Sequence, residues 1–297
     1  MTVAEIYHVI AAEIAHCTGR FFEAKHCEPL GGGCINEAAR LSDGSRSYFV
    51  KLNRAELAPL FRAESEGLCA LRDTGAIRAP EPICAGVSGE HSWLVLEFIA
   101  LGPSTPVSER RLGSALADLH RTTASAFGWQ RDNAIGSTPQ INLQCSDWTE
   151  FWARNRLGYQ VELAGHNGCP KELVARGEQL IHALPTLLAR HRPVPSLVHG
   201  DLWAGNAARD DGGAPVIFDP ATYHGDRETD LAMTELFGGF GPDFYAAYEE
   251  AWPLDSGYPL RRDLYNLYHV LNHLNLFGGS YLAQASRLVE RLLGEIY

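Results

Sequence analysis

Three polar residues late in the chain have the composition of a phosphoryl-transfer site. Asp201 lies in the segment His-Gly-Asp-Leu-Trp-Ala-Gly-Asn (199–206), and Asn206 follows it five positions later. Asp219 ends the apolar run Val-Ile-Phe, eighteen residues after Asp201. In such sites one carboxylate receives the proton of the attacking hydroxyl, while an amide and a second carboxylate hold Mg²⁺. The spacing therefore predicts Asp201 as the base and Asn206 and Asp219 as metal ligands.

Each of these residues also has a purely structural interpretation. On its own, Asp201 could close a turn and Asn206 could cap a helix. Phosphoryl transfer consists mostly of positioning and charge neutralisation, so it needs all three groups together. The eight-residue pattern, followed by a carboxylate behind an apolar strand, favours the catalytic interpretation.

An early glycine run could bind a polyphosphate. Gly31, Gly32 and Gly33 would let backbone N–H groups approach an anion, because no Cβ intervenes. A tight turn explains the same run equally well. A strand and a hairpin follow rather than a helix, which disfavours a dinucleotide-binding motif, and the absence of Gly-Lys-Ser/Thr excludes a P-loop.

Lys51 lies within the apolar strand Tyr-Phe-Val-Lys-Leu (48–52). A buried ammonium needs a partner, because desolvation penalises an isolated charge. We expect Glu64, which shares the apolar face of the next helix, and Glu66 is the alternative partner. A lysine that extends to solvent at a strand edge is the other interpretation.

The elements that must position these residues divide the chain into two parts. Before about residue 100 we expect a helix over 3–16, strands around an Asp43-Gly44 hairpin turn, a helix over 57–71 and a loop or edge strand over 79–86. The apolar run 93–101, interrupted by Glu97, predicts a buried strand and a hinge, where backbone groups near Glu97 and Ile99 would meet adenine. Beyond it we expect helices over 110–121, 147–164, 171–190, 260–276 and 280–295, with strands 196–198 and 216–218 forming one buried hairpin. The fold class is thus α+β, with a small strand-rich part (1–100, hinge at 94–102) and a larger, mainly helical part (101–297).

The composition excludes several classes of protein. With 25 Lys and Arg against 36 Asp and Glu in 297 residues, the net charge is −11, whereas nucleic-acid binding needs clustered basic residues. Seven cysteines without a CxxC pair give no disulfide framework and fit a reducing compartment. The longest apolar run, nine residues, is far shorter than the roughly 20 that span a bilayer, and no secretory signal is visible. We expect a soluble, cytoplasmic protein without nucleic-acid or membrane partners.

Along the chain, the glycine run, the strand lysine, the helix glutamate and the Asp–Asn–Asp set follow one another. Motifs in this order resemble the fructosamine kinase (ketosamine-3-kinase) family, a branch of the aminoglycoside/choline-kinase-like group with the protein-kinase-like fold. The resemblance runs nearly end to end. The segments that carry it are Gly-Gly-Gly-Cys-Ile-Asn (31–36), Phe-Val-Lys (49–51), 199–206, Val-Ile-Phe-Asp-Pro-Ala (216–221), His-Gly-Asp-Arg-Glu (224–228), Asp-Leu-Ala-Met (230–233) and Leu-Phe-Gly-Gly-Phe (236–240). Pro220 follows Asp219 where protein kinases have Phe-Gly, and no Ala-Pro-Glu occurs, so a phosphorylation-ordered activation loop is not expected.

The resemblance implies a function and roles for further residues. It implies ATP and Mg²⁺ as cofactors, and transfer of phosphate to the 3-hydroxyl of a ketosamine such as ribulosamine or fructosamine, free or on a glycated protein, which leads to deglycation. Lys51 with Glu64 would clamp phosphates, and His199 and Asp230 would support the catalytic loop. The residues expected on the acceptor side are Trp203, His224, Asp226 and His273, for which core packing or a solvated turn is the alternative.

Three points stay open at this stage. Cys34, within the glycine segment, could act as a redox switch. The protein could be a monomer or a homodimer. The alternative functions are a kinase of another small hydroxyl compound, such as an aminoglycoside or a choline-like amino alcohol, and a non-catalytic nucleotide-binding pseudokinase.

Overall fold

The computed structural model describes residues 3–31 and 36–296, and the chain divides into two compact units. The first unit comprises Met1–Pro103 and Ala208–Asp219, and the second comprises Ser104–Ala207 and Pro220–Tyr297. The sequence analysis placed residues 101–297 in the second part. The structure instead groups 208–219 with the N-terminal residues, because this segment pairs with strands there.

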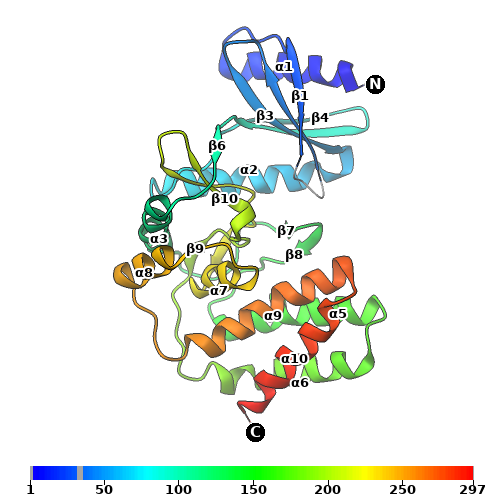
Figure 1. The fold of residues 1–297 in the computed structure, drawn as a ribbon. Coiled ribbons are helices and arrows are strands. Elements are labelled where there is room, and N and C mark those ends of the chain that lie inside the picture. Colours follow the sequence, from blue (N-terminus) through cyan, green and yellow to red (C-terminus); the bar gives the residue numbers. More distant parts are fainter. Residues whose placement is uncertain (1–2, 32–35, 297) are drawn as a thin grey trace. The chain divides into compact units, whose positions relative to one another are not determined.

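The first unit is built on a five-stranded antiparallel sheet with the order β1-β2-β3-β5-β4 (Figure 1). Its strands are β1 (His26–Leu30), β2 (Glu37–Ser42), β3 (Ser47–Arg54), β4 (Pro82–Ser88) and β5 (His91–Glu97). The expected turn joins β2 to β3, where Asp43 Oδ1 accepts the N–H groups of Ser45 (2.8 Å) and Arg46 (2.7 Å). β4 is an edge strand and begins with a proline, which cannot donate to a ladder.

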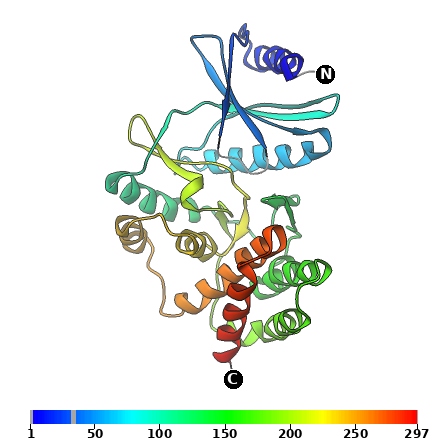
Figure 2. The ribbon, with the colours of Figure 1, turned by 45° about the vertical axis from the view of Figure 1, so that its right-hand side comes forward.

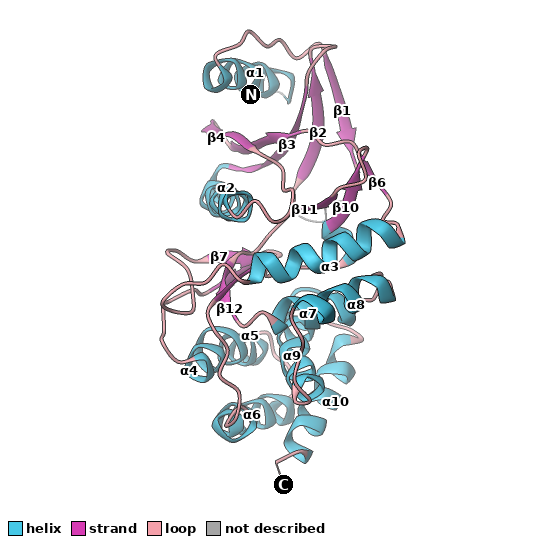
Figure 3. Ribbon diagram, turned by 90° about the vertical axis from the view of Figure 1, so that its left-hand side faces the viewer, coloured by secondary structure: helices cyan, strands magenta, loops and turns pink. Residues whose placement is uncertain are grey.

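The helices α1 (Val3–Thr18) and α2 (Ala58–Asp73) cover opposite faces of this sheet (Figures 1 and 3). Ile10 of α1 packs in one core with Val50 and Leu52 of β3. Since successive side chains of a strand alternate between faces, Lys51 points to the other face. There α2, which follows a short 3₁₀ turn (Ala55–Leu57), supplies Glu64.

A second sheet of the first unit corrects one expectation. The strands β6 (Leu101–Gly102), β10 (Ala207–Asp210) and β11 (Pro215–Ile217) pair in the order β11-β10-β6. The hairpin expected between 196–198 and 216–218 is therefore wrong, because β9 (Ser196–Val198) pairs with β12 (Tyr223–Gly225) in the second unit. The sequence pattern missed β10 and β12 because these short strands lack an apolar run.

The second unit is mainly helical (Figure 2). Its helices are α3 (Pro106–His120), α4 (Trp148–Trp152), α5 (Tyr159–His166), α6 (Lys171–Leu187), α7 (Glu228–Leu236), α8 (Pro242–Ala251), α9 (Tyr258–Phe277) and α10 (Tyr281–Gly294). A π-helical turn (Ala153–Gly158) interrupts the helix expected over 147–164, and a small hairpin joins β7 (Asn133–Ile135) to β8 (Thr138–Gln140). Residues 263–272 of α9 are all buried, so α9 forms the centre of this unit. Within the described residues, no helix is both long enough and apolar enough to cross a bilayer.

Candidate active site

The loop after β9 brings Asp201 and Asn206 together. A 3₁₀ turn (Ala204–Asn206) returns the chain, and Asn206 N donates to Trp203 O at 2.9 Å. The buried Asn206 side chain donates from Nδ2 to Asp201 O at 2.9 Å and to Asp201 Oδ2 at 3.3 Å. Because Nδ2 of Asn206 donates to Asp201, Oδ1 is the acceptor atom of this side chain.

Asp230, at the start of α7, holds the backbone before Asp201. Its Oδ2 accepts the N–H of His199 at 2.7 Å, and its Oδ1 accepts the N–H of Gly200 at 2.8 Å. Burial alone would raise the pKa of Asp230, but the bonds and charges from His120, His199 and Gly200 outweigh burial and lower it. Gly200 has φ +83°, and a Cβ there would lie 2.1 Å from Ala221 O, so only glycine fits. These contacts fix the backbone conformation at His199 and Gly200, immediately before Asp201.

A hydrogen-bonded chain behind Asp230 was missed in the sequence. His120 of α3 is fully buried, with Nε2 3.2 Å from Asp230 Oδ2 and Nδ1 2.8 Å from the Tyr248 hydroxyl. The hydroxyl also accepts from Arg227 Nη1 at 2.9 Å. Because an ionised carboxylate only accepts, Nε2 of His120 donates to Asp230, and Nδ1 is the atom that contacts the Tyr248 hydroxyl. The helical period could have predicted that His120 is buried, since His120 lies four positions after the buried Leu116 on the same helix face.

Lys51 is shared between two carboxylates within the first unit. Its Nζ donates to Glu64 Oε1 at 2.6 Å and to Asp219 Oδ1 at 2.7 Å, and the lysine is 5% exposed. Burial alone would lower the pKa of Lys51, but the charges of Glu64 and Asp219 more than offset this and raise it above its ordinary value. The lysine is therefore charged at neutral pH, and Glu64 is the partner that the helix face favoured.

Asp219 has an unusual backbone and a donor set that fits magnesium. Among the described residues it is the one non-glycine residue with positive φ (57°), a strained conformation of the kind that gathers at functional sites. Its side chain is 47% exposed although Lys51 holds one oxygen. Carboxylate and amide oxygens are the ligands that Mg²⁺ prefers, so the side chains of Asp219 and Asn206 suit this ion chemically.

Some of the residues that the sequence analysis predicted to bind the nucleotide lie outside the described residues. Gly32, Gly33 and Cys34 belong to the segment 32–35, which lies outside them, and Gly31 is exposed with open space around its Cα. Glu97 ends β5, where its N–H donates to Glu81 O at 2.7 Å and its carboxylate binds Arg78 at 2.7 Å. The adenine contacts proposed for Glu97 and Ile99 stay predictions.

Two of the acceptor-side candidates are joined by a third aromatic ring. Trp203 is 40% exposed, and its ring covers Gly205, where a Cβ would lie 2.2 Å from it. The Phe237 ring lies 6.5 Å from Trp203 and 5.0 Å from His273. His273 Nδ1 lies 2.8 Å from His269 O, and burial lowers the pKa of His273. The neutral ring donates from Nδ1, because a carbonyl only accepts, so Nε2 is its acceptor.

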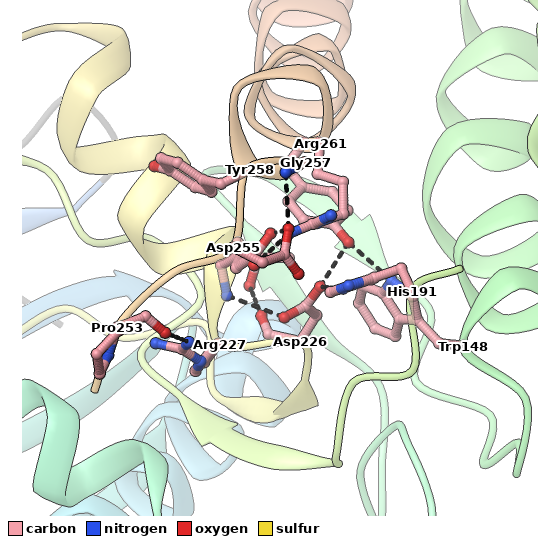
Figure 4. Close-up of polar contacts among 12 residues, drawn as sticks. Trp148, His191, Asp226, Arg227, Pro253, Asp255, Gly257, Tyr258 and Arg261 are labelled. Atoms are coloured by element: carbon pink, nitrogen blue, oxygen red, sulfur yellow. Dashed lines mark hydrogen bonds and ion pairs between the residues drawn. The ribbon is translucent and has the colours of Figure 1, made fainter. Parts of the chain in front are cut away.

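The other two candidates have different surroundings. The half-buried His224 lies against Trp129, with ring centroids 5.1 Å apart, and burial lowers the pKa of His224. Asp226 is 1% exposed, and its Oδ2 lies 2.5 Å from His191 Nε2 and accepts from the Tyr265 hydroxyl at 2.6 Å (Figure 4). These interior partners give Asp226 a structural role, whereas an acceptor contact of His224 stays a prediction.

Three metal-capable groups meet in this network, but an arginine already pairs with one of them. His191, Asp226 and Glu228 have ligand atoms within 4.8 Å of one another. Arg261 donates to both oxygens of Glu228, at 2.6 and 2.7 Å, and to Asp255 at 2.8 Å. Its guanidinium is the cation that pairs with Glu228, so the arrangement is a buried charge network that anchors the start of α7.

Each unit contains groups of the kind that phosphoryl transfer uses. The first has Lys51, which is paired with carboxylates, and the second has the hydrogen-bonded pair Asp201 and Asn206. In fold and site chemistry, the chain is a phosphotransferase of the protein-kinase-like class. It belongs to the fructosamine kinase family, whose sequence pattern matches residues 6–295. The family, the fold and the reaction class expected from the sequence are thereby confirmed.

Related proteins cover nearly the whole chain. The chain is 48% identical over 292 residues to a probable ketoamine kinase from Synechocystis sp., covering 97% of each. It is 43% identical over 267 residues to a chloroplastic protein-ribulosamine 3-kinase from Arabidopsis thaliana, covering 89% of this chain and 81% of that protein. The crystal structure of a candidate fructosamine-3-kinase from Haemophilus somnus superposes with a TM-score of 0.88 at 30% identity, over 96% of each chain.

Proposed function

We propose that this protein uses ATP and Mg²⁺ to phosphorylate the 3-hydroxyl of ketosamines such as ribulosamine and fructosamine. The observation that carries the proposal is the hydrogen bonding of Asn206 to Asp201 in a loop that Asp230 holds. The names of the relatives, a ketoamine kinase and a protein-ribulosamine 3-kinase, support the acceptor class. The unstable 3-phosphate would then leave, which makes the biological role deglycation.

In the reaction, Asp201 receives the proton of the 3-hydroxyl as its oxygen attacks the γ-phosphorus of ATP. The new O–P bond forms while the bond between the γ-phosphorus and the bridging oxygen breaks, and ADP leaves. Asn206 holds the Asp201 carboxylate in place, and Lys51, oriented by Glu64, binds a phosphate oxygen. Asn206 and Asp219 would hold Mg²⁺, which neutralises phosphate charge when bound. Gly31, Gly32 and Gly33 would cover the phosphates.

The acceptor surface we propose consists of Trp203 and His273. The exposed face of the Trp203 indole can carry the C–H face of a sugar. His273 is neutral at pH 7 because burial lowers its pKa, so its Nε2 can accept a hydrogen bond from a sugar hydroxyl. Both side chains belong to the unit that carries Asp201.

The test is ADP release by the Asp201→Asn variant with ribulosamine and fructosamine. An isosteric amide cannot take the proton, so we expect turnover to fall by a factor of about 10²–10⁴, with unchanged thermal unfolding. Aminoglycoside and choline-like acceptors serve as controls and should give little turnover. Turnover of those acceptors alone would replace the substrate class, and near-normal turnover by Asp201→Asn would remove Asp201 as the base.

A further inference from the structure

A polar cavity of the second unit lies between α9, α10 and the end of α7. The helix α9 packs against both α7 and α10 (Figures 1 and 2). The cavity has a volume of about 340 Å³, and its polar lining consists of Asp263, Asn266, Gln284, Arg287 and Arg291. None of these residues belongs to the catalytic loop or to the proposed acceptor surface. The cavity is therefore a candidate binding site apart from the proposed reaction.

The side chain of Asn266 lines this cavity and is left without a hydrogen bond. Asn266 is only 7% exposed, and its buried Oδ1 has no partner among residues 3–31 and 36–296. A buried amide without a partner is destabilising, so native proteins keep few of them. Such a group indicates a partner that is not part of the chain.

Two arginines of α10 indicate that this partner is an anion. Arg287 and Arg291 are four positions apart, so their guanidinium groups extend from the same face of the helix. Arg287 is exposed and forms no ion pair within the described part of the chain. Nη1 of Arg291 lies 2.9 Å from Oδ2 of the buried Asp263, which orients the guanidinium and leaves its other N–H groups available. Two guanidinium groups in this arrangement can hold one phosphoryl group between them.

Local charge distinguishes this cavity from two others in the same unit. Its lining carries two arginines against one aspartate, a local net charge of +1. The cavity beside Tyr245 is lined by two glutamates and no basic residue, and the cavity beside Pro170 is lined by two glutamates against one arginine. In a chain with a net charge of −11, a positive cavity is a local exception that favours an anionic ligand.

We propose that this cavity binds a sugar phosphate, with the phosphoryl group between Arg287 and Arg291 and sugar hydroxyls on Asn266 and Gln284. An amide can both donate to a hydroxyl and accept from it, which would satisfy Asn266. Ligand cavities usually measure roughly 300–1,000 Å³, so this cavity, near the lower end, suits a ligand as small as a pentose phosphate. Leu236, the last residue of α7, also lines it. The ligand would therefore contact the helix whose first turn carries Asp230.

The experiment measures the binding of ribose 5-phosphate to the full-length protein by calorimetry, with inorganic phosphate and ribose as comparison ligands. Ribose 5-phosphate should bind at least tenfold more tightly than phosphate, and ribose should show no binding at the same concentrations. In Arg287→Gln, the Kd for ribose 5-phosphate should rise about tenfold, because charge-assisted hydrogen bonds are lost. Arg190→Gln is the matched control, since Arg190 is an exposed arginine of the same unit outside the cavity, and its Kd should be unchanged.

Asn266→Leu tests the hydroxyl contact while both arginines are kept. Leucine has the same branched shape without a polar atom, so the Kd for ribose 5-phosphate should rise towards that for phosphate, with no fall in the thermal unfolding temperature. Arg287→Gln decides the matter if Asn266→Leu does not fold.

Phosphate that binds as tightly as ribose 5-phosphate overturns the ligand class. No binding to the unmodified protein, or equal Kd values in Arg287→Gln and Arg190→Gln, overturns the site. None of these outcomes depends on turnover, so the proposed function is tested separately.

Discussion

Lys51 joins two carboxylates in the interior of the first unit, and we propose that it also binds a phosphate. It is nearly fully buried and pairs with two carboxylates from separate parts of the first unit. Glu64 comes from the neighbouring helix, and Asp219 comes from the end of β11. Removing the lysine therefore leaves like charges facing each other, whereas removing Glu64 as well relieves most of that penalty.

We predict that Lys51→Met lowers the free energy of unfolding by about 3 kcal/mol and abolishes ADP release. The double variant Lys51→Met/Glu64→Gln should recover most of the stability but none of the activity, because no cation remains to bind phosphate. Urea unfolding and ADP release measure the two effects. Since the pKa of Lys51 is raised, its contribution should be complete below about pH 10.4 and disappear only at higher pH. Recovered activity in the double variant would remove Lys51 from the phosphate site.

At the scale of elements, α3 and α7 together orient the catalytic loop. α7 supplies Asp230, which holds two loop N–H groups, and α3 supplies His120, which holds Asp230. The hydroxyl of Tyr248 on α8 contacts Nδ1 of His120 at 2.8 Å and so orients the ring. Three helices are thus joined by one hydrogen-bonded chain that ends at the backbone of the loop 199–206.

His120→Asn tests this chain as a positioning device. The shorter amide cannot reach both partners, so Asp230 loses a buried donor, and we predict about a tenfold fall in kcat with little change in KM for either substrate. Tyr248→Phe keeps the bond between His120 and Asp230 and should have a smaller effect. Steady-state kinetics distinguishes a loss of positioning, which lowers kcat, from a loss of binding, which raises KM. Thermal unfolding checks that the variants fold. A change in KM alone would contradict a positioning role.

Sequence patterns predicted those parts of the site whose members are close in the chain. The spacing of Asp201 and Asn206, and the placement of Lys51 on a strand and Glu64 on a helix face, follow from local periodicity. His120 and Tyr248 escaped notice because their contacts join positions more than twenty residues apart. The hairpin expected between 196–198 and 216–218 was wrong for a related reason. Strand pairing depends on tertiary contacts, and β9 pairs with β12. β10 is too polar to show an apolar pattern.

At the scale of the whole molecule, several buried groups act together on acid stability. Burial, with the neighbouring His273 adding to it, lowers the pKa of His269 from 6.5 to about 3. The hydrogen-bonded Asp226 and Asp230 also have lowered pKa values in spite of burial. For all three, the unfolded chain binds protons that the folded protein resists, so stability is present at higher pH and falls with acidification.

The two kinds of group act in different pH ranges. The histidine contribution is complete above about pH 6.5 and is lost as pH falls towards 3, by up to about 1.4 kcal/mol per pH unit. The aspartate contributions begin to disappear only near pH 4 and below. We therefore predict that the unfolding free energy declines between pH 6.5 and 4.5 and that His269→Asn flattens this part of the curve. His166→Asn, at an exposed histidine of the same unit, should leave the curve unchanged. Urea titrations at several pH values measure the unfolding free energy of each variant. A curve equally steep in His269→Asn would show that His269 does not control acid stability.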